Sequence, residues 1–163
     1  MRTLPEAMHE YKKQLELGAI QQAYQGLMEY MLALRTHFQN QNPDLLVSGS
    51  LYFGYMDMTY FAISSKALKD RQLKIAIVFL HDKFRFEVWL AGMNKRVQAR
   101  YWQMFKESGW EKYPLVPTIQ GADSILEHIL VAEPDFSDLQ ALTQQIEAGT
   151  VKFIEAVEAF LCE

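Results

Sequence analysis

Histidines, carboxylates and thiols are the side chains of this 163-residue sequence that could act in catalysis or bind a metal ion. The four histidines, His9, His37, His81 and His128, are far apart along the chain. No two have the i, i+3 or i, i+4 spacing that places metal ligands on one helical face. Cys162 lies beside the end of the chain, where side chains seldom hold the precise geometry that a nucleophile needs. The spacing therefore predicts no metal site and no catalytic cysteine.

Short motifs that identify a reaction are also absent from the sequence. It contains no GxxxxGK[ST] phosphate loop, no GxGxxG after a strand, no HExxH, no GxSxG and no paired CxxC. An acidic nuclease-type site is a further alternative, because Asp57 and Glu87 lie in predicted hairpins. The lysine expected two positions after the glutamate is missing, since Val88 and Trp89 follow Glu87. We therefore assign no catalytic residue and expect no cofactor.

The most promising chemical grouping lies on predicted strands. Arg85, Glu87 and Trp89 occupy alternate positions, so they share the face opposite to the apolar side chains of their strand. Tyr52 and Tyr60 belong to the preceding hairpin and add hydroxyls and aromatic rings. If the strand register brings these rows together, the face has the mixture of apolar walls and few polar groups that small-molecule sites use. The alternative is that the Arg–Glu pair and the stacked rings stabilise the sheet without a ligand.

Two further candidates flank the strand that carries Glu87. His81, with Asp82, lies at the turn before it, and loop tips on a rigid sheet often carry function. Arg96, with Lys95 and Arg100, forms a basic cluster at the start of the next predicted helix, where anions can bind. The alternatives are an ordinary turn histidine and a solvated helix face. We retain His81 and Arg96 as candidate binding residues.

An α+β fold is expected to position these candidates. Hydrophobic periodicity and turn residues predict helices to about residue 17 and over 19–40, and two strands within 45–64. They then predict a helical turn over 66–70, a hairpin over 73–92, a helix to about 108, a strand within 124–132 and a terminal helix after Ser137. The result is a mainly antiparallel sheet of about five strands, two hairpins plus one, with long N- and C-terminal helices packed on it. Residues 1–163 are expected to form one domain.

Composition limits the partners and the location. Half of the residues are hydrophobic and the formal net charge is −4, so the chain lacks the basic excess that binding to a phosphate backbone requires. Charges are spread over the first twenty residues, unlike in a secretory signal, and no apolar run approaches the roughly 18 residues of a membrane helix. The single cysteine cannot form an internal disulfide. We expect a cytoplasmic protein with no membrane and no nucleic-acid partner.

Three stretches carry a family resemblance: VSGSLYFGYMDMTYFA at 47–62, LKIAIVFLHDKFRFEVWLAGMNKRVQ at 73–98 and EHILVAEPDFSDL at 127–139. Over nearly its full length the chain resembles a family of small stand-alone bacterial proteins catalogued as a domain of unknown function. The resemblance implies a cytoplasmic bacterial protein and brings no activity, ligand or catalytic residue. The order hairpin, helix, strand, terminal helix is also similar to accessory domains found beside restriction-type nucleases, which keeps a defence-related role open.

The leading functional hypothesis is a non-enzymatic module that binds a small molecule or a partner protein through the face carrying Arg85, Glu87 and Trp89. A second hypothesis is a cofactor-independent hydrolase or isomerase, in which Glu87 or His81 is the general base and Arg85 orients an anionic group. A third is a structural protein that forms a homodimer through the helix over 19–40. The alternative for that helix is packing on the core of its own chain.

Overall fold

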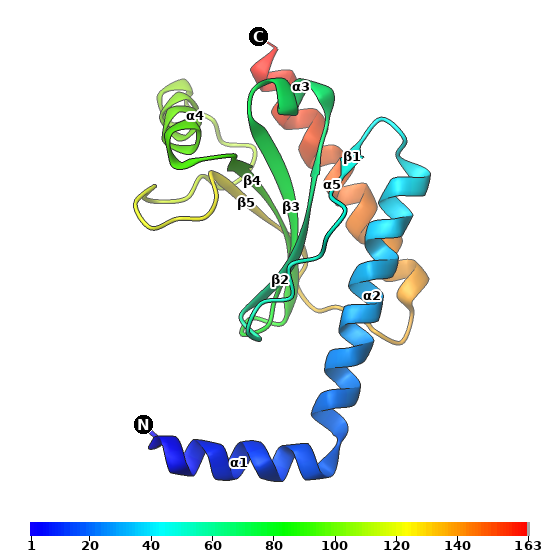
Figure 1. Cartoon of the computed structure of the whole chain (residues 1–163). Helices are drawn as coiled ribbons and strands as arrows, with labels where there is room; N and C mark the ends of the chain where they lie inside the picture. The colour runs from blue at the N-terminus through cyan, green and yellow to red at the C-terminus, as the bar shows by residue number, and fades with distance from the viewer. Residues whose placement is uncertain (163) are drawn as a thin grey trace.

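A computed structural model describes residues 1–162, and its centre is an antiparallel sheet (Figure 1). In this part of the chain the sheet has five strands: β1 (Leu46–Val47), β2 (Met58–Ser64), β3 (Leu73–Leu80), β4 (Arg85–Gly92) and β5 (Leu126–Val131). Each strand pairs with the next along the chain, so the order in the sheet is β1-β2-β3-β4-β5. The predicted α+β class and the two hairpins plus one strand are confirmed.

Alternation along the strands gives the sheet two faces. The core face carries large buried apolar side chains: Phe61, Ile63, Ile75, Ile77, Phe79, Phe86, Val88 and Leu90. The second face carries Ala76, Val78 and Trp89, with Met58, Tyr60 and Leu80 packed against them. Because the side-chain period of a strand is two, residues of one strand that differ by one position lie on opposite faces. This alternation decides which candidate site residues can meet.

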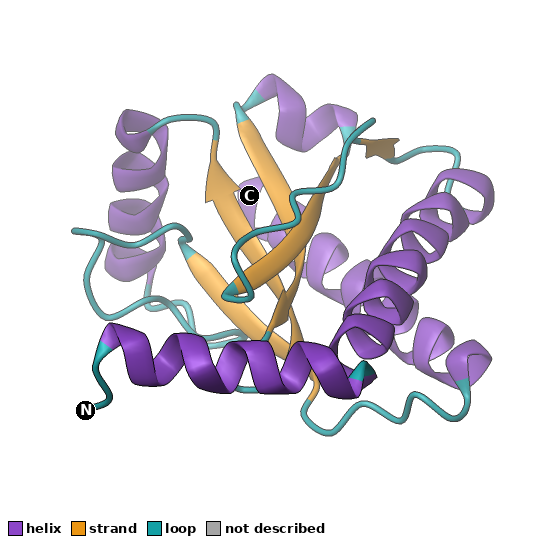
Figure 2. Ribbon diagram, turned by 60° about the horizontal axis from the view of Figure 1, so that its bottom comes forward, coloured by secondary structure: helices purple, strands orange, loops and turns teal. Residues whose placement is uncertain are grey.

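Two long helices cover the core face, α2 (Ala19–Gln41) and α5 (Leu139–Leu161), as Figure 2 shows. They are neighbours, because the Tyr30 hydroxyl lies 3.0 Å from Thr143 Oγ1 and His37 Nε2 lies 2.9 Å from Glu147 Oε2. The buried residues of α2 begin nine residues after its start: Met28, Tyr30, Met31, Leu34 and Phe38. Ile20 belongs to the apolar residues that recur at helical spacing along α2, but it is 43% exposed. The first half of α2 therefore extends beyond the core.

The first helix, α1 (Leu4–Leu17), starts with a capping box between Thr3 and Glu6 and ends at Gly18. Gly18 adopts a φ of 79°, in the left-handed region that favours glycine, and α2 begins directly after it. Figures 1 and 2 show α1 turning away from α2 and passing below the end of the sheet where β3 turns into β4. All residues of α1 lie in the described part of the chain, and none of them is buried.

The remaining helices cap the other end of the sheet. They are α3 (Lys66–Asp70), with Ser65 as its N-cap, and α4 (Lys95–Ser108), with Asn94 as its N-cap and Gly109 closing it. The buried side of α4 meets the end of α5, where the rings of Phe105 and Phe160 stack with centroids 4.4 Å apart. Across residues 1–162, no helix is long and apolar enough to cross a membrane.

Candidate binding cleft

The predicted grouping on the second face of the sheet exists, and its polar groups bind one another. Arg85 Nε donates to Glu87 Oε2 at 2.6 Å, and Trp89 Nε1 donates to Glu87 Oε1 at 2.8 Å. Glu87 is 1% exposed. Both carboxylate oxygens therefore have a partner on the same strand, which is the arrangement expected of a sheet-stabilising network.

The two tyrosines of the predicted face also meet it. Tyr52 forms an isolated antiparallel bridge with Tyr60, and their rings lie 5.0 Å apart. Tyr60 pairs with Val78, which pairs with Glu87, so the rows of the two hairpins are in register. Neither of the two clefts described below is lined by these residues. The structure brings the predicted face together, and its role in binding stays a prediction.

A large cleft lies on the other side of the sheet, beside the half of α2 that extends beyond the core. We call it the α2 cleft. Its volume is about 740 Å³. Three parts of the chain line it together with α2: the β3–β4 turn, the loop before β2 and the segment before α5. The lining residues are Ala19, Ile20, Gln22, Ala23, Tyr24, Gly26, Leu27, Tyr30, Met56, Phe79, His81, Phe84, Phe136 and Leu139.

Aromatic rings form one wall of the α2 cleft. The ring of Phe79 lies 5.2 Å from that of Phe84, and Phe84 lies 6.0 Å from Phe136. Phe84 is 57% exposed, so the wall is open to solvent. Two lining residues, Met56 and Phe84, adopt positive φ values of 63° and 52°, which are uncommon for side chains of this size. Such backbone conformations often mark functional sites.

His81 is the titratable imidazole of the α2 cleft, and its surroundings fix its tautomer. Thr59 Oγ1 donates to Phe53 O at 2.7 Å, so at 2.9 Å from His81 Nε2 it acts as the acceptor. The proton of the neutral imidazole is therefore on Nε2. Burial lowers the pKa of His81, and the nearby carboxylates of Asp57 and Asp82 partly oppose this shift. At neutral pH His81 is uncharged and offers Nδ1 as a hydrogen-bond acceptor.

His81 and Glu87 do not face a common site. The strand register pairs Phe79 with Phe86 on the core face and Val78 with Glu87 on the second face. His81 follows the alternation of Phe79 and contacts its ring at a centroid distance of 5.1 Å, on the side of the α2 cleft. The sheet separates the two groups, so the geometry does not support a joint acid–base scheme that combines His81 with Arg85 and Glu87.

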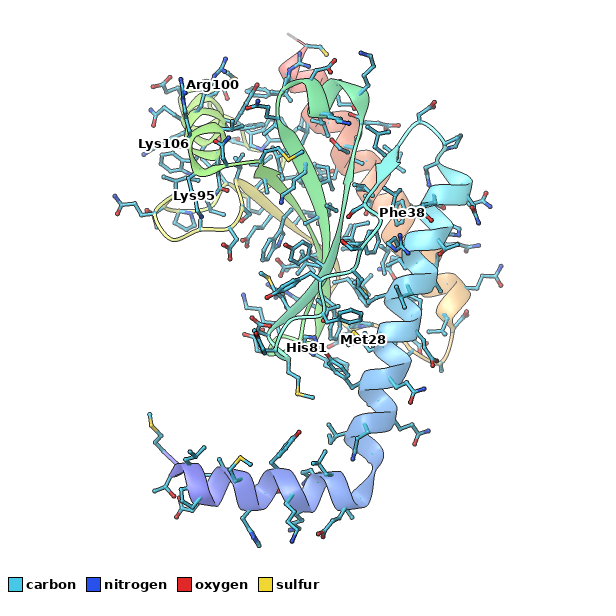
Figure 3. All side chains as sticks on the ribbon, in the orientation of Figure 1. Met28, Phe38, His81, Lys95, Arg100 and Lys106 are labelled. Carbon is cyan, nitrogen blue, oxygen red and sulfur yellow. The ribbon has the colours of Figure 1, made fainter. Side chains whose placement is uncertain are left out.

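Arg96 is also remote from the α2 cleft. It lies on α4, which follows the end of β4, whereas His81 precedes the start of β4. Figure 3 shows Lys95, Arg100 and Lys106 on α4, away from His81 at the other end of the sheet. Lys95 Nζ donates to Ala122 O at 2.9 Å, and Lys106 Nζ lies 4.8 Å from the Trp102 ring centroid. The structure thus places Arg96 in a separate basic surface.

A second hollow of about 620 Å³ lies between α2 and α5 and shares Gly26, Tyr30 and Leu139 with the α2 cleft. In the part of the chain that the structure describes, no three His, Cys, Asp or Glu side chains are placed to hold a metal ion. Sequence reasoning found His81 but missed the aromatic wall. Phe84 and Phe136 are far apart in the sequence, and only the fold brings their rings together.

The family described as Domain of unknown function (DUF7000) matches residues 4–161 of the chain. This match confirms the family resemblance found in the sequence. No curated protein and no solved structure matches the chain.

Proposed function

We propose that this chain, which belongs to the DUF7000 family, is a non-enzymatic binding module whose binding site is the α2 cleft. The observation that carries the proposal is an open cleft of about 740 Å³ with predominantly apolar and aromatic walls. Ligand sites in proteins are typically clefts of roughly 300–1,000 Å³ with apolar walls and a few polar groups that set orientation. The α2 cleft has both properties.

The chemistry of the walls defines the class of occupant. Phe84 and Phe136, which are exposed beside the buried Phe79, favour an aromatic or aliphatic group, because burying apolar surface is the main source of binding free energy there. His81 supplies one directional contact through Nδ1, which accepts a hydrogen bond from a hydroxyl or amide. The hydroxyl of Tyr30 already bonds Thr143. The expected occupant is therefore a mainly apolar group with a hydrogen-bond donor.

Binding of the apolar fluorescent probe anilinonaphthalene sulfonate tests this proposal. The variant Ala23→Trp places a bulky ring on the α2 wall of the cleft. The matched control, Gln25→Trp, carries the same ring on an exposed position of α2 that does not line the cleft. We expect the probe to bind the native chain and the control with one site per chain, and Ala23→Trp to weaken binding at least about tenfold. Equal binding by all three proteins contradicts the proposal.

A cytoplasmic location is part of the same proposal. It is supported by the exposed and unpaired Cys162 and by a fold whose described residues contain no disulfide. Fusion to a fluorescent protein that matures only in the cytoplasm tests the location. Fluorescence is expected, and a dark, exported fusion contradicts it.

A further inference from the structure

Helix α1 carries an apolar stripe that its own chain leaves exposed. The stripe consists of Leu4, Met8, Tyr11 and Leu15, spaced four, three and four residues apart, so they share one helical face. Their exposures are 74%, 53%, 55% and 37%. A helix of 14 residues is marginal in water when no tertiary packing supports it. A partner that buries this stripe would stabilise the helix.

The stripe does not reach the cleft of its own chain. The lining of the α2 cleft begins at Ala19, directly after the Gly18 elbow, and includes no residue of α1 among the described residues. Figure 1 shows α1 leading away from the first half of α2. One chain therefore presents both an open apolar cleft and an exposed apolar helix face.

The wall that α2 contributes to the cleft is as long as the stripe, and its small side chains complement the large side chains of the stripe. Ala19, Ala23 and Gly26 lie four and three residues apart on α2, and their small side chains leave space along that wall. The wall from Ala19 to Tyr30 and the stripe from Leu4 to Leu15 both span about 17 Å at the helical rise per residue. Large side chains on one helix facing small ones on another give close helix packing.

Gly26 indicates independently that another helix lies close to α2. Glycine in the interior of a helix costs about 1 kcal/mol relative to alanine. A Cβ added at Gly26 would have no atom within 4 Å to meet, so packing within the chain does not require glycine there. A second helix backbone lying against this position gives a reason for it.

We propose that the occupant of the α2 cleft is helix α1 of a second copy of this chain. The inference rests on the proposed function and names the partner at the same site. Each copy contributes one stripe and one cleft, so a two-fold symmetric dimer fills both clefts and covers both stripes. Two copies occupy all of these surfaces, so the assembly stops at a dimer.

The charges around the two surfaces are complementary. Asp57 and Asp82 are exposed at the end of the α2 cleft, next to His81, and with the neighbouring exposed Lys83 they leave this end with a net negative charge. Lys12 borders the stripe of α1, follows Tyr11 and is 77% exposed, in a loose pair with Glu16 at 3.9 Å. Such an exposed pair is worth little, so Lys12 is available to the acidic end of the cleft. Added salt is expected to slow association of the copies.

The interface area of the proposed dimer sets the affinity that we expect between the two copies. One helix face of 14 residues measures about 21 Å by about 10 Å, and the two stripes and two cleft walls of a dimer together cover about 800 Å². This is below the roughly 1,200–2,000 Å² of a standard specific interface and fits a weak, transient one, so we expect dissociation in the micromolar range. Measurements therefore have to extend well above and below that range.

Sedimentation equilibrium with two complementary variants tests the exchange. The stripe variant, Met8→Glu with Tyr11→Glu, keeps the cleft, and the cleft variant, Ala23→Trp, keeps the stripe. Their controls are Lys13→Glu, on the opposite side of α1, and Gln25→Trp on α2. Far-ultraviolet circular dichroism confirms that each variant is folded. We expect the native chain and both controls to dimerise and each variant alone to be monomeric.

Mixing the two variants gives the decisive result. An intact stripe of one can enter the intact cleft of the other, so the mixture is expected to form a heterodimer. Only one of the two contacts of the native dimer forms, so the heterodimer is expected to dissociate at about millimolar concentration. Three results overturn the inference: a native chain that stays monomeric at high micromolar concentration, a stripe variant that still dimerises, and a mixture that stays monomeric when both variants are at millimolar concentration.

The probe separates failure of this inference from failure of the proposed function. If the native chain stays monomeric and its cleft still binds anilinonaphthalene sulfonate, the dimer is refuted and the binding function stands. If the stripe variant, whose cleft is vacant in either case, binds no probe, the proposed function fails. Under the dimer, probe binding to the native chain is expected to weaken as protein concentration rises, because α1 and the probe compete for one cleft.

Discussion

The carboxylate of Glu87 is held within the sheet by Arg85 and Trp89. Replacing Glu87 by alanine leaves the Trp89 indole N–H without its partner and removes the counter-charge of Arg85. Because Glu87 is 1% exposed, we expect Glu87→Ala to lower the free energy of unfolding by about 2–4 kcal/mol in urea titrations. The exposed control, Glu111→Ala, is expected to change it by less than about 0.5 kcal/mol. Equal effects of the two substitutions contradict a structural role for the network.

His81 makes stability depend on pH with a defined sign. Burial lowers its pKa from the ordinary value of 6.5. The unfolded chain then binds the proton more readily than the folded chain. The contribution of His81 to the free energy of unfolding is therefore complete above the unfolded pKa, and it is lost as the pH falls from 6.5 towards the folded pKa. Burial lowers the pKa of His128 as well, in the same direction. Between about pH 7 and about pH 5, the free energy of unfolding measured in urea is expected to decline. We expect His81→Gln to make this decline shallower. We expect the double variant, His81→Gln with His128→Gln, to abolish most of it. An unchanged slope contradicts this assignment.

Residue types and strand period were enough to predict that Arg85, Glu87 and Trp89 share a face. Whether Tyr60 lies on the same face depends on the strand register, which the fold supplies. They were not enough to show that Glu87 already has two donors, because that depends on side-chain rotamers. The cleft wall is less predictable still. Phe84 and Phe136 come from two loops, and their rings meet only after β4 and α5 take their places.

At the scale of the elements, α2 contains a glycine that packing within the chain does not require. Gly26 is in the helix interior, and an added Cβ has no atom within 4 Å. We expect Gly26→Ala to raise the free energy of unfolding by about 0.5–1 kcal/mol, because alanine loses less backbone entropy. Gly92→Ala is the contrast, since its Cβ would lie 2.6 Å from the Gln98 backbone nitrogen. Urea titrations at submicromolar concentration, where the copies are separate, should show stabilisation by the first substitution and destabilisation by the second. A loss of stability in Gly26→Ala under these conditions contradicts the inference that packing within the chain does not need this glycine.

Helix α1 offers a local readout of association. In the isolated chain its residues, all of them described, are unburied, so its amides should exchange rapidly with solvent. If a second copy covers the stripe, hydrogen exchange of α1 is expected to slow as protein concentration rises through the micromolar range. Amides of α5 around Phe153 serve as the internal control and should be protected at every concentration, because α5 is packed on the core. Concentration-independent exchange of α1 contradicts association through this helix.

The periodicity of α2 predicted its bounds to within a residue. It did not predict which part of the helix is buried in the core and which part lines a cleft. Ile20, Tyr24, Leu27, Met31, Leu34 and Phe38 form one continuous apolar seam in the sequence. In the fold, the seam is buried in the core from Met31 onwards, whereas Ile20, Tyr24 and Leu27 line the α2 cleft. A hydrophobic pattern reports that a surface avoids water, and it does not report whether the covering partner belongs to the same chain.

At the scale of the whole molecule, the sheet was predictable because its pairings are sequential. Each hairpin joins strands that are adjacent in the chain, and such neighbours usually pair. The placement of α1 was not predictable, since no buried contact fixes it to the body. Local signals, Thr3 with Glu6 at one end and Gly18 at the other, were sufficient to define it as a helix.

Removing residues 2–17 therefore separates folding from association. The buried apolar side chains of the described chain lie in α2 to α5, the strands and the loops, and α1 contributes none. At submicromolar concentration we expect the truncated chain to unfold in urea with a free energy within about 0.5 kcal/mol of the full chain. At high micromolar concentration the full chain should become the more stable of the two, because dimerisation favours the folded state by mass action and the truncated chain has no stripe to exchange. If truncation destabilises the chain equally at both concentrations, α1 supports its own copy of the fold, and the exposed stripe has no bearing on association.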